Sequence, residues 1–317
     1  MSLPETPAGN RTGVFDRDRD KWMLARAQGI GASEAAALLG KSHFSSALEV
    51  YASKVNPLPP VESELMDWGH ILEAPIIGEY AKRQGIEYQI EGEMIFSSRF
   101  PHAFCTIDAS TIGKDGPEAI ECKTTSMGHL FPQHEHDGKE LPLHIQIQLQ
   151  QQLLCTGWKK NTCVWLPMPE RIMGFKSVSA HAEFQTLLGE SIEAFWSDHV
   201  VKGLPPEPDG SSSASKAINH LYPDPESDER LELSEENLAR KLELDSLKAD
   251  EKKLKGQIAK IDQELKLLMK HNEIGTFPDG SQLTYRKTSP KPSQCKNCGH
   301  ETPRSSFRSL RFKKGRS

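Results

Sequence analysis

Two acidic residues and one lysine near the middle of the chain have the types and spacing needed for chemistry on a phosphate ester. Asp108 ends one apolar stretch, and Glu121 and Lys123 follow in the next one. The turn residues between them predict a β-hairpin with strands at Ala103–Ile107 and Glu118–Thr124. Because side chains alternate along a strand, Glu121 and Lys123 lie on one face. Two carboxylates and an ammonium group that converge can bind a divalent metal ion and cleave a phosphodiester.

The composition is that of a polar chain without a membrane segment. Its 317 residues are 36% hydrophobic and carry a formal net charge of −5, and the mean hydropathy is −0.56. No apolar run approaches the ~18 residues of a membrane span. The first residues also lack the apolar core of a signal peptide. We therefore expect no membrane partner and a cytoplasmic location.

The positive charge is concentrated at the C-terminus. Residues 285–317 contain ten Lys or Arg and one Glu, so the rest of the chain is acidic. This tail, with Phe307 and Phe312 among its cations, suits contacts with a phosphate backbone, and simple disorder is the alternative. Cys295 and Cys298 begin a C-x-x-C-x-H pattern. Because no fourth ligand follows, a structural zinc ion is not expected there.

A glycine-containing segment near the N-terminus could bind an anion. A short helix is predicted over Asp20–Arg26, and Ser33 is a credible N-cap for a second helix over Glu34–Leu39. The bare backbone of Gly29 and Gly31 beside a helix N-terminus suits a bound anion. An ordinary capped helix remains the alternative on this local pattern.

A long helix is predicted over Glu64–Gln84, where apolar residues recur at helical spacing. Pro75 inside it predicts a kink or the start of a second helix. Glu73 lies next to the apolar stripe, so on this pattern alone it is either a solvated acid or a ligand that faces the site. A strand over Ile86–Phe96 then leads into the predicted hairpin.

Pro142 opens a helix that is rich in glutamine. Its Gln148 and Gln150–Gln152 can line a groove while the apolar residues between them pack, and plain solvation of the glutamines is the alternative. A loop with three histidines precedes it at Ser126–Asp137, and a surface loop is favoured there over a metal site. Three elements are expected to follow: strands at Lys160–Pro167 and Arg171–Ser179, and a helix at His181–Val200.

Changes in composition divide the chain into five segments. Helices and strands alternate in a first α/β domain, and a segment rich in Pro, Gly and Ser closes it. The expected segments are a flexible N-terminus (1–19), the α/β domain (20–205), a linker (206–226), a helical extension that ends in a β-hairpin (227–290) and a basic tail (291–317).

The helical extension carries a seven-residue repeat. Apolar residues occupy two positions of each repeat, and Glu251 interrupts one of the two series. A coiled coil or a helical hairpin is therefore expected, with self-association as one use of it. The two series are Leu247, Leu254, Ile261 and Leu268, and Leu244, Ile258 and Leu265.

Four separated blocks, in this order, resemble the YqaJ-type viral recombinase family, which includes the lambda exonuclease, within the PD-(D/E)xK nuclease superfamily. The resemblance covers about residues 15–205. It implies an α/β, restriction-endonuclease-like core with a central mixed β-sheet flanked by helices, and leaves the C-terminal helical extension outside. Ile107 replaces the family's proline before the aspartate. The blocks are Trp22 to Arg26 with GIGASE, WGHILEAPIIGEY at Trp68–Tyr80, Asp108 with Glu121-Cys122-Lys123, and PLHIQIQLQQQLLCTG at Pro142–Gly157.

The resemblance implies a metal centre. Asp108 and Glu121 would hold the ions, with Glu73 and the backbone carbonyl of Cys122 as further ligands. Lys123 would orient or activate the attacking water and stabilise charge on the phosphate. Hard oxygen ligands favour Mg²⁺, with Mn²⁺ as a substitute, and two ions are expected.

The resemblance also implies how DNA is held. Gln148 would border the site, and Arg26 and Ser33 would belong to a pocket for the 5′-phosphate of a DNA end. The implied activity is Mg²⁺-dependent 5′→3′ hydrolysis of double-stranded DNA from its ends. The resulting 3′ single strands would serve phage-type recombination with a single-strand annealing protein in a bacterial host's cytoplasm, and a trimeric ring is the implied assembly.

Two other classes of function stay open. The same core could serve a repair endonuclease or a Cas4-like iron–sulfur nuclease. Four cysteines are available to such a cluster, but they lack clustered ligand spacing. A non-catalytic DNA-end-binding scaffold could instead be built around the coiled coil and the basic tail. The presence of Asp108, Glu121 and Lys123 together argues against such a scaffold.

Overall fold

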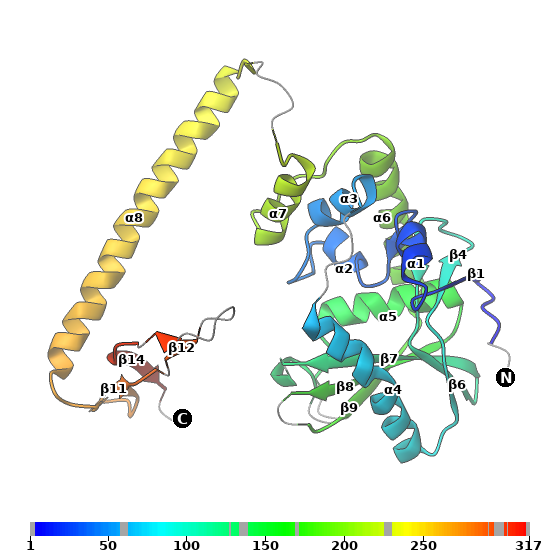
Figure 1. Ribbon diagram of the computed structural model, residues 1–317, viewed down its shortest axis with the longest axis horizontal. Coiled ribbons are helices and arrows are strands. Elements are labelled where there is room, and N and C mark those ends of the chain that lie inside the picture. The colour runs from blue at the N-terminus through cyan, green and yellow to red at the C-terminus, as the bar shows by residue number, and fades with distance from the viewer. Residues whose placement is uncertain are drawn as a thin grey trace. The chain divides into compact units, whose positions relative to one another are not determined.

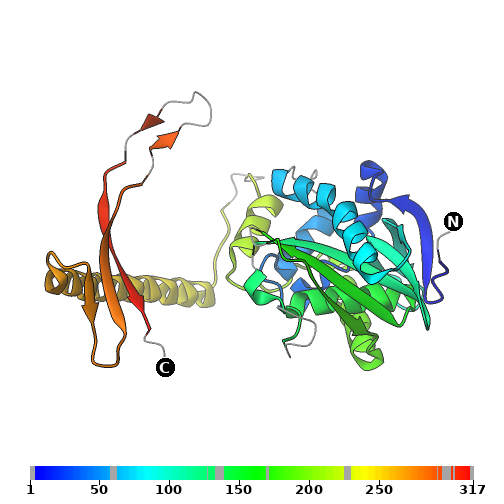
Figure 2. The same cartoon turned by 90° about the horizontal axis from the view of Figure 1, so that it is seen from below.

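The computed structural model describes residues 4–57, 63–126, 128–132, 139–168, 171–224, 230–290, 292–294, 301–302 and 304–314. The chain forms two compact units, Met1–Glu226 and Ser227–Ser317, each treated by itself below. Among the described residues, no helix combines the length and the apolar character that crossing a membrane would need. Figures 1 and 2 show both units.

A five-stranded mixed sheet forms the centre of the N-terminal unit, in the order β3-β6-β7-β8-β9. β7 and β8 are parallel, and the other neighbours are antiparallel. Because parallel neighbours cannot be joined by a tight turn, the chain crosses over through helix α5. The elements are β3 (Tyr88–Ile90), β6 (Ala109–Gly113), β7 (Gly116–Thr125), β8 (Lys160–Pro167), β9 (Gly174–Ser179) and α5 (Leu143–Thr156).

Two helices cover opposite faces of this sheet. Ile77 and Tyr80 of α4 (Glu64–Gln84) share one buried cluster with Cys122, whereas Leu149 of α5 shares another with Trp165. The continuous course of α4 across the sheet can be followed in Figure 1. The predicted fold class, a central mixed sheet flanked by helices with a C-terminal helical extension, is confirmed.

The predicted hairpin exists, but its first strand was placed wrongly. Ala103–Cys105 forms β5, which pairs with β4 and β2 in a different sheet. The partner of β7 is β6, and Gly113 and Gly116 close that hairpin. The backbone φ of Gly116 is +116°, which glycine alone adopts readily. Asp108 therefore lies where the chain passes from one sheet to the other.

The second sheet is four-stranded, in the order β1-β4-β5-β2. The predicted strand over Ile86–Phe96 is split, because β3 belongs to the central sheet and β4 to this one. The prediction of a flexible N-terminus over residues 1–19 did not anticipate β1. The strands are β1 (Gly9–Phe15), β2 (Ile30–Gly31), β4 (Glu93–Ser97) and β5 (Ala103–Cys105).

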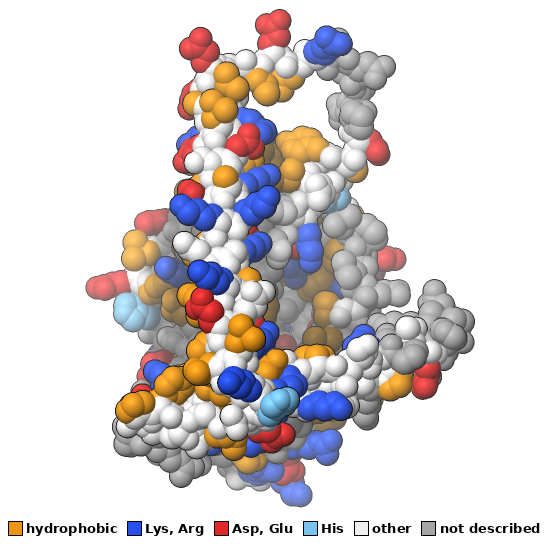
Figure 3. All heavy atoms as spheres, turned by 90° about the vertical axis from the view of Figure 1, so that its left-hand side faces the viewer, with side chains coloured by type: hydrophobic (Ala, Val, Ile, Leu, Met, Phe, Trp, Pro, Cys, Tyr) orange, Lys and Arg blue, Asp and Glu red, His pale blue; other side chains and the backbone are white. Residues whose placement is uncertain are grey.

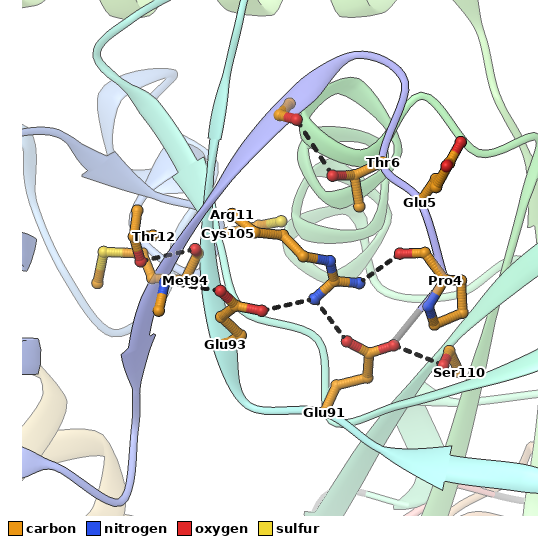
Figure 4. A network of polar contacts seen from close by, with 12 residues as sticks. Pro4, Glu5, Thr6, Arg11, Thr12, Glu91, Glu93, Met94, Cys105 and Ser110 are labelled. Carbon is orange, nitrogen blue, oxygen red and sulfur yellow. Dashed lines mark hydrogen bonds and ion pairs between the residues drawn. The ribbon is translucent and has the colours of Figure 1, made fainter. Parts of the chain in front are cut away.

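A buried ionic network ties β1 to the rest of the unit (Figure 4). The Arg11 guanidinium donates to Glu91 at 2.9 Å and to Glu93 at 3.1 Å. It also donates to the Pro4 carbonyl at 3.0 Å, and the Ser110 hydroxyl donates to Glu91 at 2.5 Å. One guanidinium thus joins the N-terminal strand to both sheets.

The remaining helices of this unit largely follow their predictions. Pro75 does not start a second helix, because α4 runs without a break from Glu64 to Gln84. Within the predicted linker, α7 packs against α3, where the Ser46 and Ser213 hydroxyls are 3.1 Å apart. The helices are α1 (Arg19–Arg26), α2 (Ala35–Leu38), α3 (Ala47–Val55), α6 (Ala182–Phe195) with a π-helical end (Trp196–Val201), and α7 (Ser212–Leu221); a 3₁₀ turn lies at Gly128–Leu130.

The C-terminal unit combines one long helix with a three-stranded antiparallel sheet. α8 begins with a capping box, in which Ser234 and Asn237 exchange hydrogen bonds. The predicted terminal β-hairpin is confirmed as β10–β11, and β14 pairs along the whole of β11. The elements are α8 (Glu235–Met269), β10 (Ile274–Thr276), β11 (Gln282–Thr288), β12 (Ser293–Gln294), β13 (Glu301–Thr302) and β14 (Phe307–Lys313).

The sheet packs against the last turns of α8 and carries part of the basic tail. Met269 and Leu283 are buried there. Arg308 lies 3.8 Å from the centre of the Tyr285 ring and donates to the Asn272 carbonyl at 2.7 Å. The alternative of a disordered tail is therefore wrong for Phe307–Lys313. Cys295 and Cys298 lie outside the described residues.

Gly256 offers a test of how much the helix itself contributes to the stability of this unit. A Cβ added at Gly256 meets nothing within 4 Å. Gly256→Ala should therefore stabilise the C-terminal unit by about 1 kcal/mol, because alanine has less backbone freedom to lose. Urea unfolding followed by circular dichroism checks this. Gly280→Ala is the matched control and should destabilise, because the φ of Gly280 is +76°. A destabilised Gly256→Ala would contradict the helix placement.

Candidate functional site

The buried Glu121 carboxylate is the focus of the polar residues in the central sheet. The residue is 3% exposed. Gln148 donates to one carboxylate oxygen at 2.5 Å and Gln152 to the other at 2.6 Å. The Lys123 ammonium forms an ion pair with Glu121 at 2.6 Å. The predicted alternation along β7 is thus observed, because Glu121 and Lys123 face α5 while Cys122 faces α4.

The glutamines of α5 are structural polar residues inside the protein, so plain solvation is wrong for three of the four. Gln151 is fully buried and donates to the carbonyls of Ile30 and Phe104 at 2.7 and 2.8 Å, which joins α5 to the second sheet. Gln152 also donates to the Thr106 carbonyl at 2.9 Å and accepts from Asn161 at 2.7 Å. Sequence reasoning included Gln152 in the groove but missed its contact with the acid.

Asp108 reaches β7 from the loop that precedes β6. One of its carboxylate oxygens accepts a hydrogen bond from the Cys122 amide at 2.7 Å. Burial raises the pKa of Asp108 well above its ordinary value, and the charges of Glu121 and Glu73 raise it further. The carboxylates therefore form a group in which negative charge is in excess. Such a group favours a nearby cation.

Glu73 joins this group from α4. Its side chain is 31% exposed, and one oxygen lies 3.2 Å from the His70 imidazole. Burial raises the pKa of Glu73; His70 opposes this shift, and the Glu121 charge adds to it. Among the described residues, however, no three His, Cys, Asp or Glu side chains meet closely enough to form a complete metal cage. Any ion held here would need ligands beyond these side chains.

Lys123 keeps its positive charge in this setting. Burial acts to lower the pKa of its ammonium, but Glu121 and Asp108 outweigh burial and raise that pKa. A protonated lysine donates hydrogen bonds and stabilises negative charge.

One cleft connects the acidic group with the predicted phosphate residues. It has a volume of about 1060 Å³, and its wall includes Asp108, Glu73, Arg26 and Ser33. Arg26 and Ser33 lie far from Asp108 in the sequence, so the fold brings them to the same cavity. Glu121 and Lys123 on β7 and Gln148 on α5 do not line the cleft, but the charge of Glu121 acts on both Asp108 and Glu73, which do. The structure thus collects the residues that the sequence singled out.

A buried ionic cluster that the sequence did not predict holds Arg26 in this cleft. The guanidinium of Arg26 pairs with Glu34 and stacks 4.8 Å from the centre of the Trp22 ring. The Lys54 ammonium, with its side chain 2% exposed, forms a second pair with Glu34 at 2.9 Å. The Gly31 amide donates to the same carboxylate at 2.7 Å. Glu34 and Lys54 are twenty positions apart, so the sequence near either residue does not indicate that they form an ion pair.

The predicted N-cap is wrong. α2 begins at Ala35 with Glu34 at the N-cap position, and no side chain caps it. Ser33 is instead exposed on the cleft wall. The residue therefore lines the cleft, and the phosphate-binding role that the resemblance implied for it stays a prediction.

The mixed sheet, the acids Asp108 and Glu121 and the lysine on β7 have the arrangement that the resemblance to PD-(D/E)xK nucleases implied. The predicted family resemblance is confirmed, because residues 21–159 match the model of the YqaJ-like viral recombinase domain. The uncharacterized protein YqaJ of Bacillus subtilis (strain 168) is 25% identical over 264 residues, which are 82% of this chain and 81% of that protein.

Solved structures with a similar fold are more distant. The alkaline exonuclease LHK-Exo from Laribacter hongkongensis has 16% identity and a TM-score of 0.47 over 58% of this chain and 94% of that one. A phage related exonuclease from Haemophilus somnus 129PT has 9% identity and a TM-score of 0.41 over 55% and 96%, respectively.

The Glu34 cluster predicts a pH-dependent loss of stability. Burial acts to raise the pKa of Glu34, but Lys54 and Arg26 outweigh it and lower the pKa from 4.5 to about 2. A carboxyl whose pKa is lower in the folded state stabilises the fold fully above about pH 4.5, and that contribution disappears as the pH falls toward 2. Glu34→Gln should therefore cost about 3 kcal/mol at pH 7, and clearly less at pH 3.

Urea unfolding of the wild type and of Glu34→Gln, each at pH 7 and at pH 3, measures the difference in their free energies of unfolding. The exposed pair of Glu79 and Arg83, 2.7 Å apart, supplies the control. Glu79→Gln should change stability little at either pH, because water screens an exposed pair. A Glu34→Gln protein as stable as the wild type at pH 7 would show that the cluster contributes nothing.

Proposed function

We propose that the chain is a Mg²⁺-dependent 5′→3′ exonuclease that hydrolyses double-stranded DNA from its ends. The observation that carries this proposal is the convergence of Asp108, Glu121 and Lys123 beside a cleft that also holds Glu73 and Arg26. The match to a viral recombinase domain supports a role in recombination. The proposed nuclease domain is the N-terminal unit, Met1–Glu226, which includes the strand and helix found in the predicted N-terminus and linker, and the helical extension and basic tail follow it.

The residues of the acidic group fit divalent metal ions. Asp108, Glu121 and Glu73 would offer carboxylate oxygens and Cys122 its backbone carbonyl, and all are hard ligands of the kind that Mg²⁺ and Mn²⁺ prefer. Mg²⁺ is usually held by one or two carboxylates, water and substrate phosphates, so an incomplete protein cage suits it. When bound, such ions neutralise the phosphodiester and acidify water. We propose that two such ions bind at the acidic group.

The surrounding side chains orient the acid and stabilise charge. Gln148 and Gln152 hold the two oxygens of Glu121 in fixed directions, and Asn161 fixes Gln152 in turn. Such preorganisation avoids rearrangement during the reaction. Lys123 would leave part of its pairing with Glu121 and donate to a phosphate oxygen on which negative charge increases. It would also orient the attacking water.

Arg26 and Ser33 would bind the 5′-phosphate of the DNA end. A guanidinium recognises phosphate through two parallel hydrogen bonds, and it does so best when its orientation is fixed. Glu34 and Trp22 fix the orientation of Arg26 at the cleft. Rebinding of each new 5′-phosphate would direct successive cuts along one strand. The remaining 3′ strand would pass to a single-strand annealing protein. We further propose that the enzyme assembles as a trimeric ring and acts in the cytoplasm of a phage-infected bacterium.

Removal of the lysine tests the catalytic part. Lys123→Ala should lower the rate of nucleotide release from linear duplex DNA with Mg²⁺ by about a hundredfold or more, because a preorganised charge is lost. Lys160→Ala is the matched control, since Lys160 pairs with Glu118 at 3.0 Å on neighbouring strands. It should keep nearly full activity. Binding of DNA without Mg²⁺-dependent cleavage by the wild type would favour the scaffold, and cutting of closed circular duplex would favour an endonuclease.

Removal of the cleft guanidinium tests end recognition. The wild type should degrade 5′-phosphorylated duplex faster than 5′-hydroxyl duplex, and Arg26→Ala should lose most of that preference. Arg19→Ala is the matched control, because Arg19 lines the same cleft and stacks 5.0 Å from the same Trp22 ring. Rates on the two substrates give the preference directly. An unchanged preference in Arg26→Ala would remove the proposed phosphate pocket while leaving the nuclease intact.

A further inference from the structure

α8 presents an apolar seam to solvent over most of its length. Every residue from Glu235 to Ile261 is exposed, and Figure 3 shows apolar and charged side chains side by side along the helix. A helix that buries no face has only its own hydrogen bonds and local pairs to stabilise it. The apolar residues of the seam, with their exposed fractions, are Leu244 (44%), Leu247 (60%), Leu254 (56%), Ile258 (59%), Ile261 (57%) and Leu268 (72%).

The spacing of this seam is that of a coiled coil. Its residues alternate at intervals of three and four, which places them at the a and d positions of successive heptads. A strict seven-residue period keeps such a seam on one side only when two helices supercoil around each other. The unit's own sheet covers just the end of α8, where Leu265 is half-buried and Met269 is buried. The seam before it is therefore left for another helix.

The charges that flank the seam specify the kind of partner. Glu243 and Asp250 occupy g positions, and Lys248 and Lys255 occupy the e positions that follow them by five residues. In a parallel, in-register pair, each g residue faces the e residue of the next heptad on the other helix. Position 243 of one copy then meets position 248 of the second, and position 250 meets 255. Both contacts join opposite charges, and each occurs twice.

An antiparallel pair would place like charges together. In that arrangement g positions face g positions and e positions face e positions. Asp250 would then meet Glu264 and Lys255 would meet its own copy, which are repulsions, whereas Lys248 would meet Asp262. The flanking charges therefore favour the parallel orientation, in which all four contacts of these g and e residues are attractive.

We propose that α8 forms a parallel, in-register, two-stranded coiled coil with a second copy of the chain over residues 244–268. Glu251 occupies the single a position that is not apolar, and its pairing with Lys255 at 2.7 Å lies within one helix. In a parallel, in-register pair the two Glu251 side chains face each other, and their repulsion lowers the stability of the pair. The pairing is therefore weaker than that of a fully apolar seam, and it does not depend on the proposed nuclease activity.

Charge reversal on the full-length protein tests the pairing. The double variant Lys248→Glu with Lys255→Glu should halve the particle mass measured by light scattering, whatever the state of the N-terminal unit, because four attractions become repulsions. The complementary variant, Glu243→Lys with Asp250→Lys, should do the same. When the two double variants carry different tags and are mixed in equal amounts, the original particle mass should return. Capture through one tag should then also recover the variant that carries the other tag. Glu251→Leu should lower the dissociation constant at least tenfold.

A single engineered cysteine tests the orientation. In a Cys295→Ser, Cys298→Ser background, Leu247→Cys should form a disulfide-linked pair on oxidation, because equal d positions meet in a parallel coiled coil. Ala249→Cys lies on the outer face of the same turn and should not. In an antiparallel pair the two copies of position 247 would lie about 27 Å apart along the axis. Failure of Leu247→Cys to link would exclude the parallel arrangement.

Three results would overturn the proposal. The first is a particle mass that neither charge-reversal variant changes. The second is a fall to one third, which would indicate three strands. The third is a mixture that fails to recover the original mass although circular dichroism shows both variants to be folded.

Discussion

The buried carboxylate of Glu121 sets the requirement that the rest of the N-terminal unit meets. A carboxylate that is removed from water must receive hydrogen bonds or a counter-charge, or it costs several kcal/mol. Here two glutamines and a lysine satisfy it. The glutamines must come from a helix that crosses the same face as β7, and the parallel β7–β8 pair requires just such a crossover. Topology and electrostatics therefore demand the same element, α5.

The strand that carries Glu121 also determines where the neighbouring acids lie. Asp108 is attached to β7 through the Cys122 amide, so its position follows the strand that carries Glu121. Glu73 comes from the helix on the opposite face of the sheet. The sheet and the two helices that cover it thus hold three acids close enough that, besides burial, the charge of Glu121 raises the pKa of Asp108 and of Glu73. Their mutual repulsion costs stability, and a nearby cation would relieve it.

The parts of the structure that the sequence predicted are those with a local signal. Glu121 and Lys123 lie in an apolar run bounded by turn residues, so their strand and its alternation could be predicted from their own neighbours. The partner strand was misplaced because Ala103–Ile107 is as apolar as a hairpin strand should be, and only tertiary pairing assigns its first residues to the other sheet. Local pattern does not specify which strand is the partner.

Residues with long-range roles could not be predicted in the same way. Glu34 was predicted only as the first residue of a helix, and its two cationic partners come from other helices that the fold brings to it. The glutamines of α5 have the composition of a solvated face, and burial against two sheets reverses that expectation for Gln151 and Gln152. The helix α8 could be predicted because its seven-residue repeat lies entirely within one element.

The length of α8 has a consequence for where the basic tail can act. An α-helix rises about 1.5 Å per residue, so the 35 residues of α8 span roughly 52 Å. Arg286, Arg311 and Lys313 are exposed on the sheet at the far end of this rod. Duplex DNA carries a base pair about every 3.4 Å, so the rod measures some fifteen base pairs. The helix therefore separates these exposed cations from the point where it begins by about its own length.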